Sequence, residues 1–238
     1  GQVFKVQANM DAAHRDRIAF VRICSGRFER GMVVTHAGTG RPFATKYAHQ
    51  LFGRERTTAE TAYPGDVVGL VNASALRPGE TLYTGPRVTF PPIASFAPEL
   101  FSTARPVDVQ RAKPFRRGIA QLDAEGVVQV LRNENRGEQE PVLAAVGPMQ
   151  FDVVRQRMEQ EFRCAIELTP LPFSIVRRTD AAGAARLERE RGVEVCTRAQ
   201  DGATLALFTN GWRLEAVRSD HPEVLLEALV AGDAAAPA

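Results

Sequence analysis

Four arginines flank the short apolar stretch "IAFVRICSG", residues 18–26. Arg15 and Arg17 precede it, and Arg27 and Arg30 follow it. The planar guanidinium group of arginine suits contacts with phosphate oxygens, and such contacts position proteins on nucleic acid. The same side chains could instead serve as solvent-exposed charges that keep the protein soluble. The residues alone leave these two interpretations evenly balanced.

No motif in the sequence predicts catalysis. The phosphate-binding pattern G-x-x-x-x-G-K-[ST] is absent, and the D-x-x-G spacing at Asp66–Gly69 is better explained as a turn followed by a strand. The three cysteines lie far apart and form no zinc-ligand pattern. We therefore expect no catalytic, cofactor-binding or metal-binding residues.

Composition narrows the class of protein. The chain has 238 residues, 44% of them hydrophobic, and a net charge of +2. This near-neutral charge argues against a protein that coats nucleic acid, but it leaves room for local basic loops. An odd cysteine count favours a reducing compartment, and we expect a cytoplasmic protein with neither a secretory signal nor a membrane partner. Because Gly1 leads directly into the strand pattern "VFKV", we expect a piece of a longer polypeptide.

The elements that hold the arginines are strands. Short strands separated by Gly and Pro predict an antiparallel β-barrel over residues 1–90. Within residues 18–24, side chains alternate between two faces, and both faces carry apolar residues. A barrel has only one inner face, so the outer face should pack against another domain. The residues expected to make this inter-domain contact are Ile18, Phe20, Arg22, Gly65 and Asp66.

The backbone conformation explains why glycines stand at both ends of the arginine-containing loop. Gly26 and Gly31 allow the positive φ angles that tight turns require. We therefore expect residues 26–31 to form a compact loop between two strands.

A proline-rich segment, residues 86–98, marks a domain boundary near Phe90. The order β-α-β-β-α-β over about residues 98–170 predicts a ferredoxin-like, or split βαβ, unit in an α+β domain that covers residues 91–238. Pro114 should lie in the first turn of its first helix or bend that helix. Helical spacing predicts one buried face for each helix: Ala112, Phe115, Ile119 and Leu122 in the first, and Met149, Val153, Val154, Met158 and Phe162 in the second.

An additional α/β unit should cover about residues 171–231. Its pattern predicts a strand, a helix and three further strands, the last of them at "WRLEAVR", residues 212–218. The segment "PEVLLEALVA", residues 222–231, should be a final helix.

Several segments resemble known proteins. "HRDRIAFVRICSGRFERGM" and "AYPGDVVGL" resemble the second-domain barrel of translational GTPases. "FAPELF", "GIAQLDAEGVVQV" and "AAVGPMQFDVVRQRMEQEF" resemble the third domain of the bacterial class-two release factors. The similarity extends from about Val3 to about Leu229, and its most specific part is Gly147–Asp152.

The resemblance implies a role in translation termination. In this family GTP promotes the dissociation of class-one release factors from the ribosome, and the GTP/GDP pocket lies in an N-terminal domain. The chain is similar to the two C-terminal domains without that GTPase domain, so it should have no cofactor and no enzymatic activity of its own. The implied partners are small-subunit ribosomal RNA and protein, the GTPase domain in cis and, indirectly, the class-one release factor.

Two alternatives remain open. The chain could be a fragment of another ribosomal GTPase, such as an elongation or ribosome-protection factor. It could also be a stand-alone enzyme, built from a barrel and a ferredoxin-like domain, with its active site at their junction.

Overall fold

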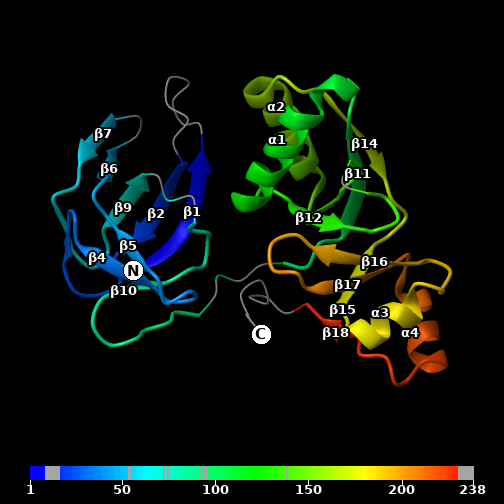
Figure 1. The fold of residues 1–238 in the computed structure, drawn as a ribbon. Coiled ribbons are helices and arrows are strands. Elements are labelled where there is room, and N and C mark those ends of the chain that lie inside the picture. Colours follow the sequence, from blue (N-terminus) through cyan, green and yellow to red (C-terminus); the bar gives the residue numbers. More distant parts are fainter. Residues whose placement is uncertain are drawn as a thin grey trace. The chain divides into compact units, whose positions relative to one another are not determined.

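The computed structural model describes residues 1–8, 17–52, 55–71, 73, 75–91, 93, 96–137 and 139–229. The chain forms two compact units, one from Gly1 to Ile93 and the other beginning at Ala94 (Figure 1). We call them unit 1 and unit 2. Their boundary lies close to the one expected near Phe90.

Unit 1 is a barrel-like arrangement of antiparallel strands. Its largest sheet has the order β1-β2-β9-β6-β7, beside a sheet with the order β10-β4-β5 and the pair β3-β8. The strands are β1 (Gln2–Ala8), β2 (Arg17–Arg22), β3 (Phe28–Glu29), β4 (Val33–His36), β5 (Pro42–Ala44), β6 (Ala48–Phe52), β7 (Glu55–Thr58), β8 (Thr61–Ala62), β9 (Val67–Val71) and β10 (Leu82–Tyr83).

Strand β2 shows the predicted alternation. Ala19, Val21 and Ile23 belong to the core of unit 1, whereas Ile18 and Phe20 lie on the other face. On β9, Val68 and Leu70 likewise belong to the core, and this one-sided contribution is what the period-two pattern predicted.

The first half of unit 2 is the predicted split βαβ unit. Its four strands have the order β14-β11-β13-β12, and every pairing between them is antiparallel. The elements, in chain order, are β11 (Leu100–Pro106), the 3-10 helix η1 (Val109–Arg111), α1 (Ala112–Ala124), β12 (Gln129–Arg132), β13 (Val142–Ala145), α2 (Pro148–Phe162) and β14 (Ile166–Pro170).

The second half of unit 2 repeats the topology of the first. Its strand order, β18-β15-β17-β16, is again fourth, first, third, second. The elements are β15 (Ile175–Arg178), α3 (Ala181–Leu187), β16 (Val193–Arg198), β17 (Thr204–Phe208), α4 (Gly211–Asp220) and β18 (Glu227–Ala228). The edge strands β12 and β16 pair through Leu131↔Arg198 and Arg132↔Thr197, which joins the halves into one eight-stranded sheet.

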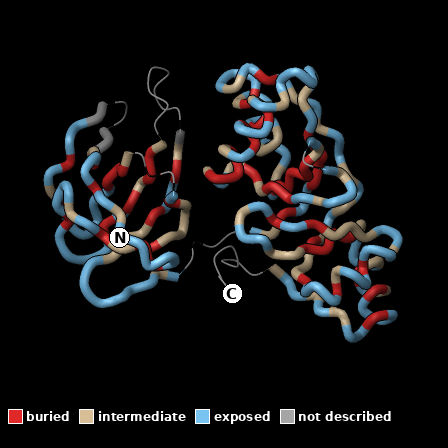
Figure 2. Tube along the Cα trace, in the orientation of Figure 1, coloured by how far each residue is buried: buried red, intermediate tan, exposed pale blue. Residues whose placement is uncertain are grey.

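The two faces of this sheet bury different cores, and buried residues follow its strands (Figure 2). On β13, Leu143 and Ala145 pack in the core with α1 and α2, whereas Val142 and Ala144 face the opposite way. That opposite face forms one core with Val176, Cys196, Leu205 and Leu207 of the second half. The additional α/β unit is therefore the second half of one domain.

The sequence pattern was wrong for the last two elements. Residues 212–218 belong to α4, because the Asn210 side chain accepts a hydrogen bond from Arg213 N and caps a helix that buries Leu214 and Val217. Residues 222–229 contain no helix but supply β18, which pairs with β15. Tertiary pairing at the sheet edge outweighs the helix propensity of this Leu-rich segment.

The helix predictions for the first half need one correction. Phe115, Ile119 and Leu122 are buried in α1, and Val154 and Met158 in α2. Pro114 lies in the first turn of α1, where proline is tolerated. In α2, however, Met149 is 77% exposed and Val153 is 40% exposed, because the apolar stripe of this helix is wider than the surface that the sheet covers.

Candidate nucleic-acid interface

The predicted arginines lie at opposite ends of β2. Arg17 is the first residue of this strand, and its Nη2 donates a hydrogen bond to the carbonyl oxygen of Leu76 at 3.2 Å. Arg27 and Arg30 follow the other end of the strand, about 20 Å away at the rise of an extended chain. Arg15 lies outside the described residues. The structure therefore places Arg27 and Arg30 at the two ends of the short strand β3 and places Arg17 elsewhere.

The loop with Arg27 and Arg30 is exposed and charge-paired. Arg27 Nη2 lies 3.2 Å from Glu29 Oε1, and Arg30 Nε donates to Glu60 Oε2 at 3.0 Å. All four side chains are about half exposed, and ion pairs of this kind contribute only about 0–1 kcal/mol. A phosphate group could therefore replace either carboxylate at small cost.

The glycines of this loop have the expected conformation. Gly26 and Gly31 adopt φ angles of 72° and 84°, in the left-handed region that residues with a side chain seldom occupy. The expected compact loop, however, contains the two-residue strand β3, which pairs with β8, so Arg27 and Arg30 flank a short strand.

Gly65 and Asp66 form a turn that closes onto the end of β2. Gly65 has a φ of 101°, its N–H donates to Ile23 O, and Ile23 N–H donates to Asp66 O. Asp66 Oδ2 also accepts from Tyr63 N at 2.8 Å. Both residues therefore have a local structural role, and nothing in their contacts tests the predicted inter-domain one.

The outer face of β2 is partly covered within unit 1. Ile18 is fully buried, and the Phe20 ring lies 6.2 Å from that of Phe4, with Lys5 Nζ 5.5 Å above it. Phe4 remains 43% exposed and Val67 40% exposed. The apolar outer face expected from the sequence is thus present, with Arg22 exposed at its end.

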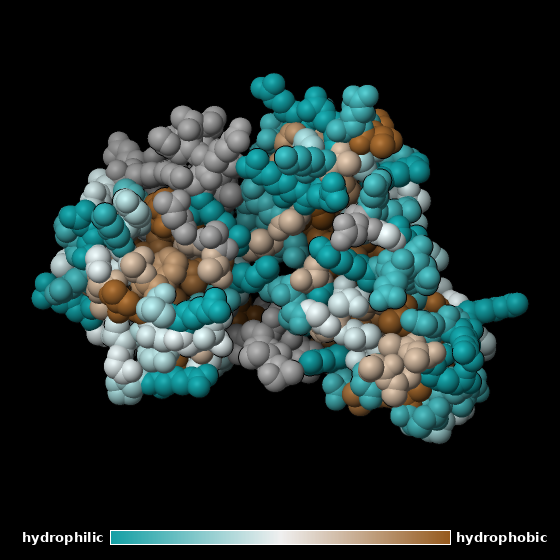
Figure 3. Space-filling model, in the orientation of Figure 1, coloured by the Kyte–Doolittle hydropathy of each residue, from teal (hydrophilic) through white to brown (hydrophobic). Residues whose placement is uncertain are grey.

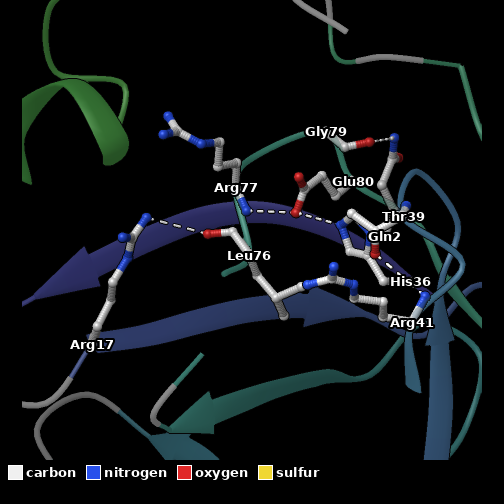
Figure 4. A network of polar contacts seen from close by, with 9 residues as sticks. All are labelled: Gln2, Arg17, His36, Thr39, Arg41, Leu76, Arg77, Gly79 and Glu80. Carbon is white, nitrogen blue, oxygen red and sulfur yellow. Dashed lines mark hydrogen bonds and ion pairs between the residues drawn. The ribbon is translucent and has the colours of Figure 1, made fainter. Parts of the chain in front are cut away.

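A polar network around Glu80 in unit 1 was not predicted from the sequence (Figure 4). Glu80 Oε2 accepts from Arg77 N at 2.7 Å and lies 2.9 Å from His36 Nε2. His36 Nδ1 accepts a hydrogen bond from Thr39 N at 3.0 Å. Arg41 follows this turn and is exposed. The sequence did not identify Arg41 as a candidate because the segment Gly38–Pro42 indicated only a hairpin turn.

The acidic side chains near the end of α1 have structural partners. Asp123 Oδ1 accepts from Val130 N at 3.0 Å, and Glu125 forms an ion pair with Arg157 at 2.7 Å. Among the described residues, no group of three or more His, Cys, Asp or Glu could hold a metal ion. Within the same ranges, no helix is long and apolar enough to cross a membrane.

Two family models match the chain, and they meet within a few residues of the boundary between unit 1 and unit 2. Residues 90–218, more than half of the chain, match the model of the class II release factor RF3, C-terminal domain. The chain belongs to the class II release factor family. Residues 1–85 match the model of elongation factor G domain 2, in agreement with the predicted barrel of a translation factor.

Relatives in this family cover nearly all of the chain. Proteins named peptide chain release factor 3 from Synechococcus elongatus and Synechocystis sp. are each 42% identical to it over 96% of its length, and the one from Nostoc punctiforme is 40% identical. The chain spans only 41–42% of the length of these relatives. A crystal structure of a Thermus thermophilus protein, 19% identical, has a similar fold, with a TM-score of 0.59 over 85% of this chain and 29% of that one.

The family segment Gly147–Asp152 has a structural role here. Gln150 Oε1 accepts from Val146 N and Gly147 N, and Gln150 Nε2 donates to Val127 O at 2.8 Å. This side chain therefore caps α2 and ties it to the segment that leads into β12. Sequence reasoning identified the segment as specific but not this contact.

Proposed function

We propose that this chain is the ribosome-contacting and coupling part of a peptide chain release factor that promotes dissociation of class-one release factors in translation termination. The observation that carries the proposal is the similarity to proteins named peptide chain release factor 3 over 96% of the chain. The proposed activity belongs to a whole protein of which the chain spans the equivalent of about two-fifths.

GTP and GDP, in this proposal, bind in a GTPase domain that precedes the part described here. The partly covered apolar face with Phe4, Phe20 and Val67 is the contact surface for that domain. Rigid units that move about such an interface can transmit a change at a nucleotide site to a distant partner. The site of action is the cytoplasmic ribosome.

Arg27 and Arg30 contact phosphates of small-subunit ribosomal RNA in this proposal, and small-subunit protein lies nearby. The support is local: both guanidinium groups are exposed, and their present partners bind them weakly. Arg17 would form a separate contact at the other end of β2, and Arg15 remains a sequence prediction.

Neutralising this loop should weaken binding to small ribosomal subunits. In R27Q/R30Q two phosphate contacts are lost, so the slope of log affinity against log salt should become shallower by about 2. The measurement is pelleting of the chain with purified small subunits across a series of salt concentrations.

The matched control removes the competing carboxylates instead. E29Q/E60Q frees both arginines and should strengthen binding under the same conditions. If both double variants bind like the wild type, this loop does not contact RNA. If the wild type binds neither small subunits nor whole ribosomes, the proposed function is wrong.

A further inference from the structure

We propose that one end of unit 2 is a second RNA-binding surface, which holds phosphate groups through Arg111, Lys113, Arg117 and Arg163. We call these four residues the basic end. The inference rests on the proposed function, because it adds a surface on a different unit for the same class of partner.

The fold brings the four residues together from two segments. The 3-10 helix η1 ends at Arg111 and continues into α1, and Lys113 and Arg117 are one helical turn apart on α1. Arg163 ends α2, and the next residue, Cys164, has its Sγ 3.9 Å from Arg111 O. The start of α1 therefore meets the end of α2, and all four side chains are exposed.

None of the four forms an ion pair with an acid among the described residues. Neighbouring arginines do so: Arg105 pairs with Glu167 and Arg157 with Glu125. Glu161 lies two residues before Arg163 but pairs with Arg157. Asp108 lies three residues before Arg111, and its Oδ1 accepts from Gln110 N and caps η1. The basic end thus keeps an excess of positive charge, unlike Arg105 and Arg157 of the same half.

Arg163 occupies a position that favours glycine. Its φ of 50° is the only positive φ of a non-glycine residue in the described part of the chain. A helix that ends in this left-handed conformation usually has Gly there, because a side chain costs about 1 kcal/mol. Arg163 presents an exposed charge at the end of α2, where a cation also interacts favourably with the helix dipole and offsets part of this cost.

The internal repeat of unit 2 provides a comparison. Helix α3 holds the position in the second half that α1 holds in the first, and it begins with the Asp180 cap followed by Ala181 and Ala182. The first turn of α1 has no acidic residue and contains Lys113. Since positive charge near a helix N-terminus is unfavourable, and the same topology forms without it, the cations of α1 are not required by the fold.

RNA is the partner that this chemistry fits best. Three of the four cations are arginines, whose planar guanidinium groups match phosphate oxygens, and the start of a helix adds its own positive potential. The exposed residues Val107 and Val109 adjoin the basic end and could instead contact a protein. The experiment separates these partners.

Figure 3 shows hydrophilic side chains over much of the visible face of unit 2, with hydrophobic ones in small separate areas.

The test compares the whole chain with the variant R111Q/K113Q/R163G. Two probes are used, purified small ribosomal subunits and a protein-free transcript of small-subunit ribosomal RNA. At about 100 mM salt the variant should bind both probes at least roughly tenfold more weakly, and its salt slope should be shallower by about 2 to 3. Its free energy of unfolding should equal or exceed that of the wild type, because glycine suits position 163.

The control is R189Q, which removes an exposed arginine from the second half and should leave affinity and slope nearly unchanged. Wild-type-like binding by the triple variant overturns the proposal and leaves the proposed function standing. Weaker binding to subunits but not to the RNA transcript shows a protein partner and also overturns it. If the wild type binds neither probe, this proposal is wrong, and the proposed function is wrong as well if the chain also fails to bind whole ribosomes.

Discussion

Replacing Asp201 by alanine should destabilise unit 2 by about 3–5 kcal/mol. Asp201 holds Arg198 by two hydrogen bonds, from Nε to Oδ1 at 2.8 Å and from Nη2 to Oδ2 at 2.6 Å, and Oδ1 also accepts from Ala203 N. The Arg198 side chain is only 4% exposed, so the variant leaves a buried charge without this carboxylate. Arg198 also lies at the pairing of β12 with β16, where the two halves join.

The measurement is urea unfolding of D201A and the wild type at neutral and acidic pH. Burial alone would raise the pKa of Asp201, but the hydrogen bonds from Arg198 and Ala203 N outweigh it and hold the pKa below its ordinary value of 3.8. A carboxylate with a lowered pKa stabilises the fold above its ordinary pKa and loses that contribution as the pH falls through its pKa in the folded protein. The difference between the two proteins should therefore shrink below about pH 4.

Asp152 provides the control for this prediction. It also pairs with an arginine, Arg155 at 3.4 Å, but its side chain is 72% exposed. D152A should cost less than about 1 kcal/mol. A cost for D201A as small as that of D152A would show that the Arg198–Asp201 pair does not stabilise the junction of the two halves.

Replacing Leu131 by alanine should cost about 2–5 kcal/mol and should loosen both halves of unit 2. Leu131 is fully buried on β12, in the core that the first half shares with Leu205 and Leu207 of the second. Because one core serves both halves, a cavity at Leu131 removes packing from each of them. Hydrogen exchange followed by mass spectrometry should show faster exchange of β17 as well as of β12 and β13.

The control is Met149→Ala, in which an exposed side chain is shortened within the same half. It should change the unfolding free energy by less than about 0.5 kcal/mol. If L131A exchanges faster only in the first half, the halves are independent units and the shared core does not couple them.

Patterns over a few neighbouring residues predicted the elements that carry their own apolar face, but not those that depend on a cap or on pairing with a distant strand. The order of elements in the first half of unit 2 was readable because its helices carry a clear apolar face at Phe115, Ile119 and Leu122. The internal repeat was not readable, because "WRLEAVR" alternates like a strand and becomes a helix through the cap at Asn210. The two-residue strand β18 exists only through its pairing with β15.

For the candidate sites too, the sequence could not predict contacts between residues that are distant along the chain. Sequence spacing identified the loop with Arg27 and Arg30 and the need for Gly26 and Gly31. It could not show that Glu60, thirty residues away in sequence, pairs with Arg30. Nor could it show that α1 and α2 bring Arg111 and Arg163 together, because that depends on helix packing across the sheet.

The central claim is that this chain carries the ribosome-contact surface of a release factor, and competition on the ribosome tests it most directly. Intact peptide chain release factor 3 from Synechocystis sp., the source of a 42% identical relative, is given GTP and post-termination ribosomes that hold a labelled class-one release factor. The rate of label release is then measured with increasing amounts of this chain. We expect the chain to slow release in a saturable manner, because it occupies the same ribosomal surface without the nucleotide-driven step. An unchanged release rate at a large excess of the chain would contradict the account.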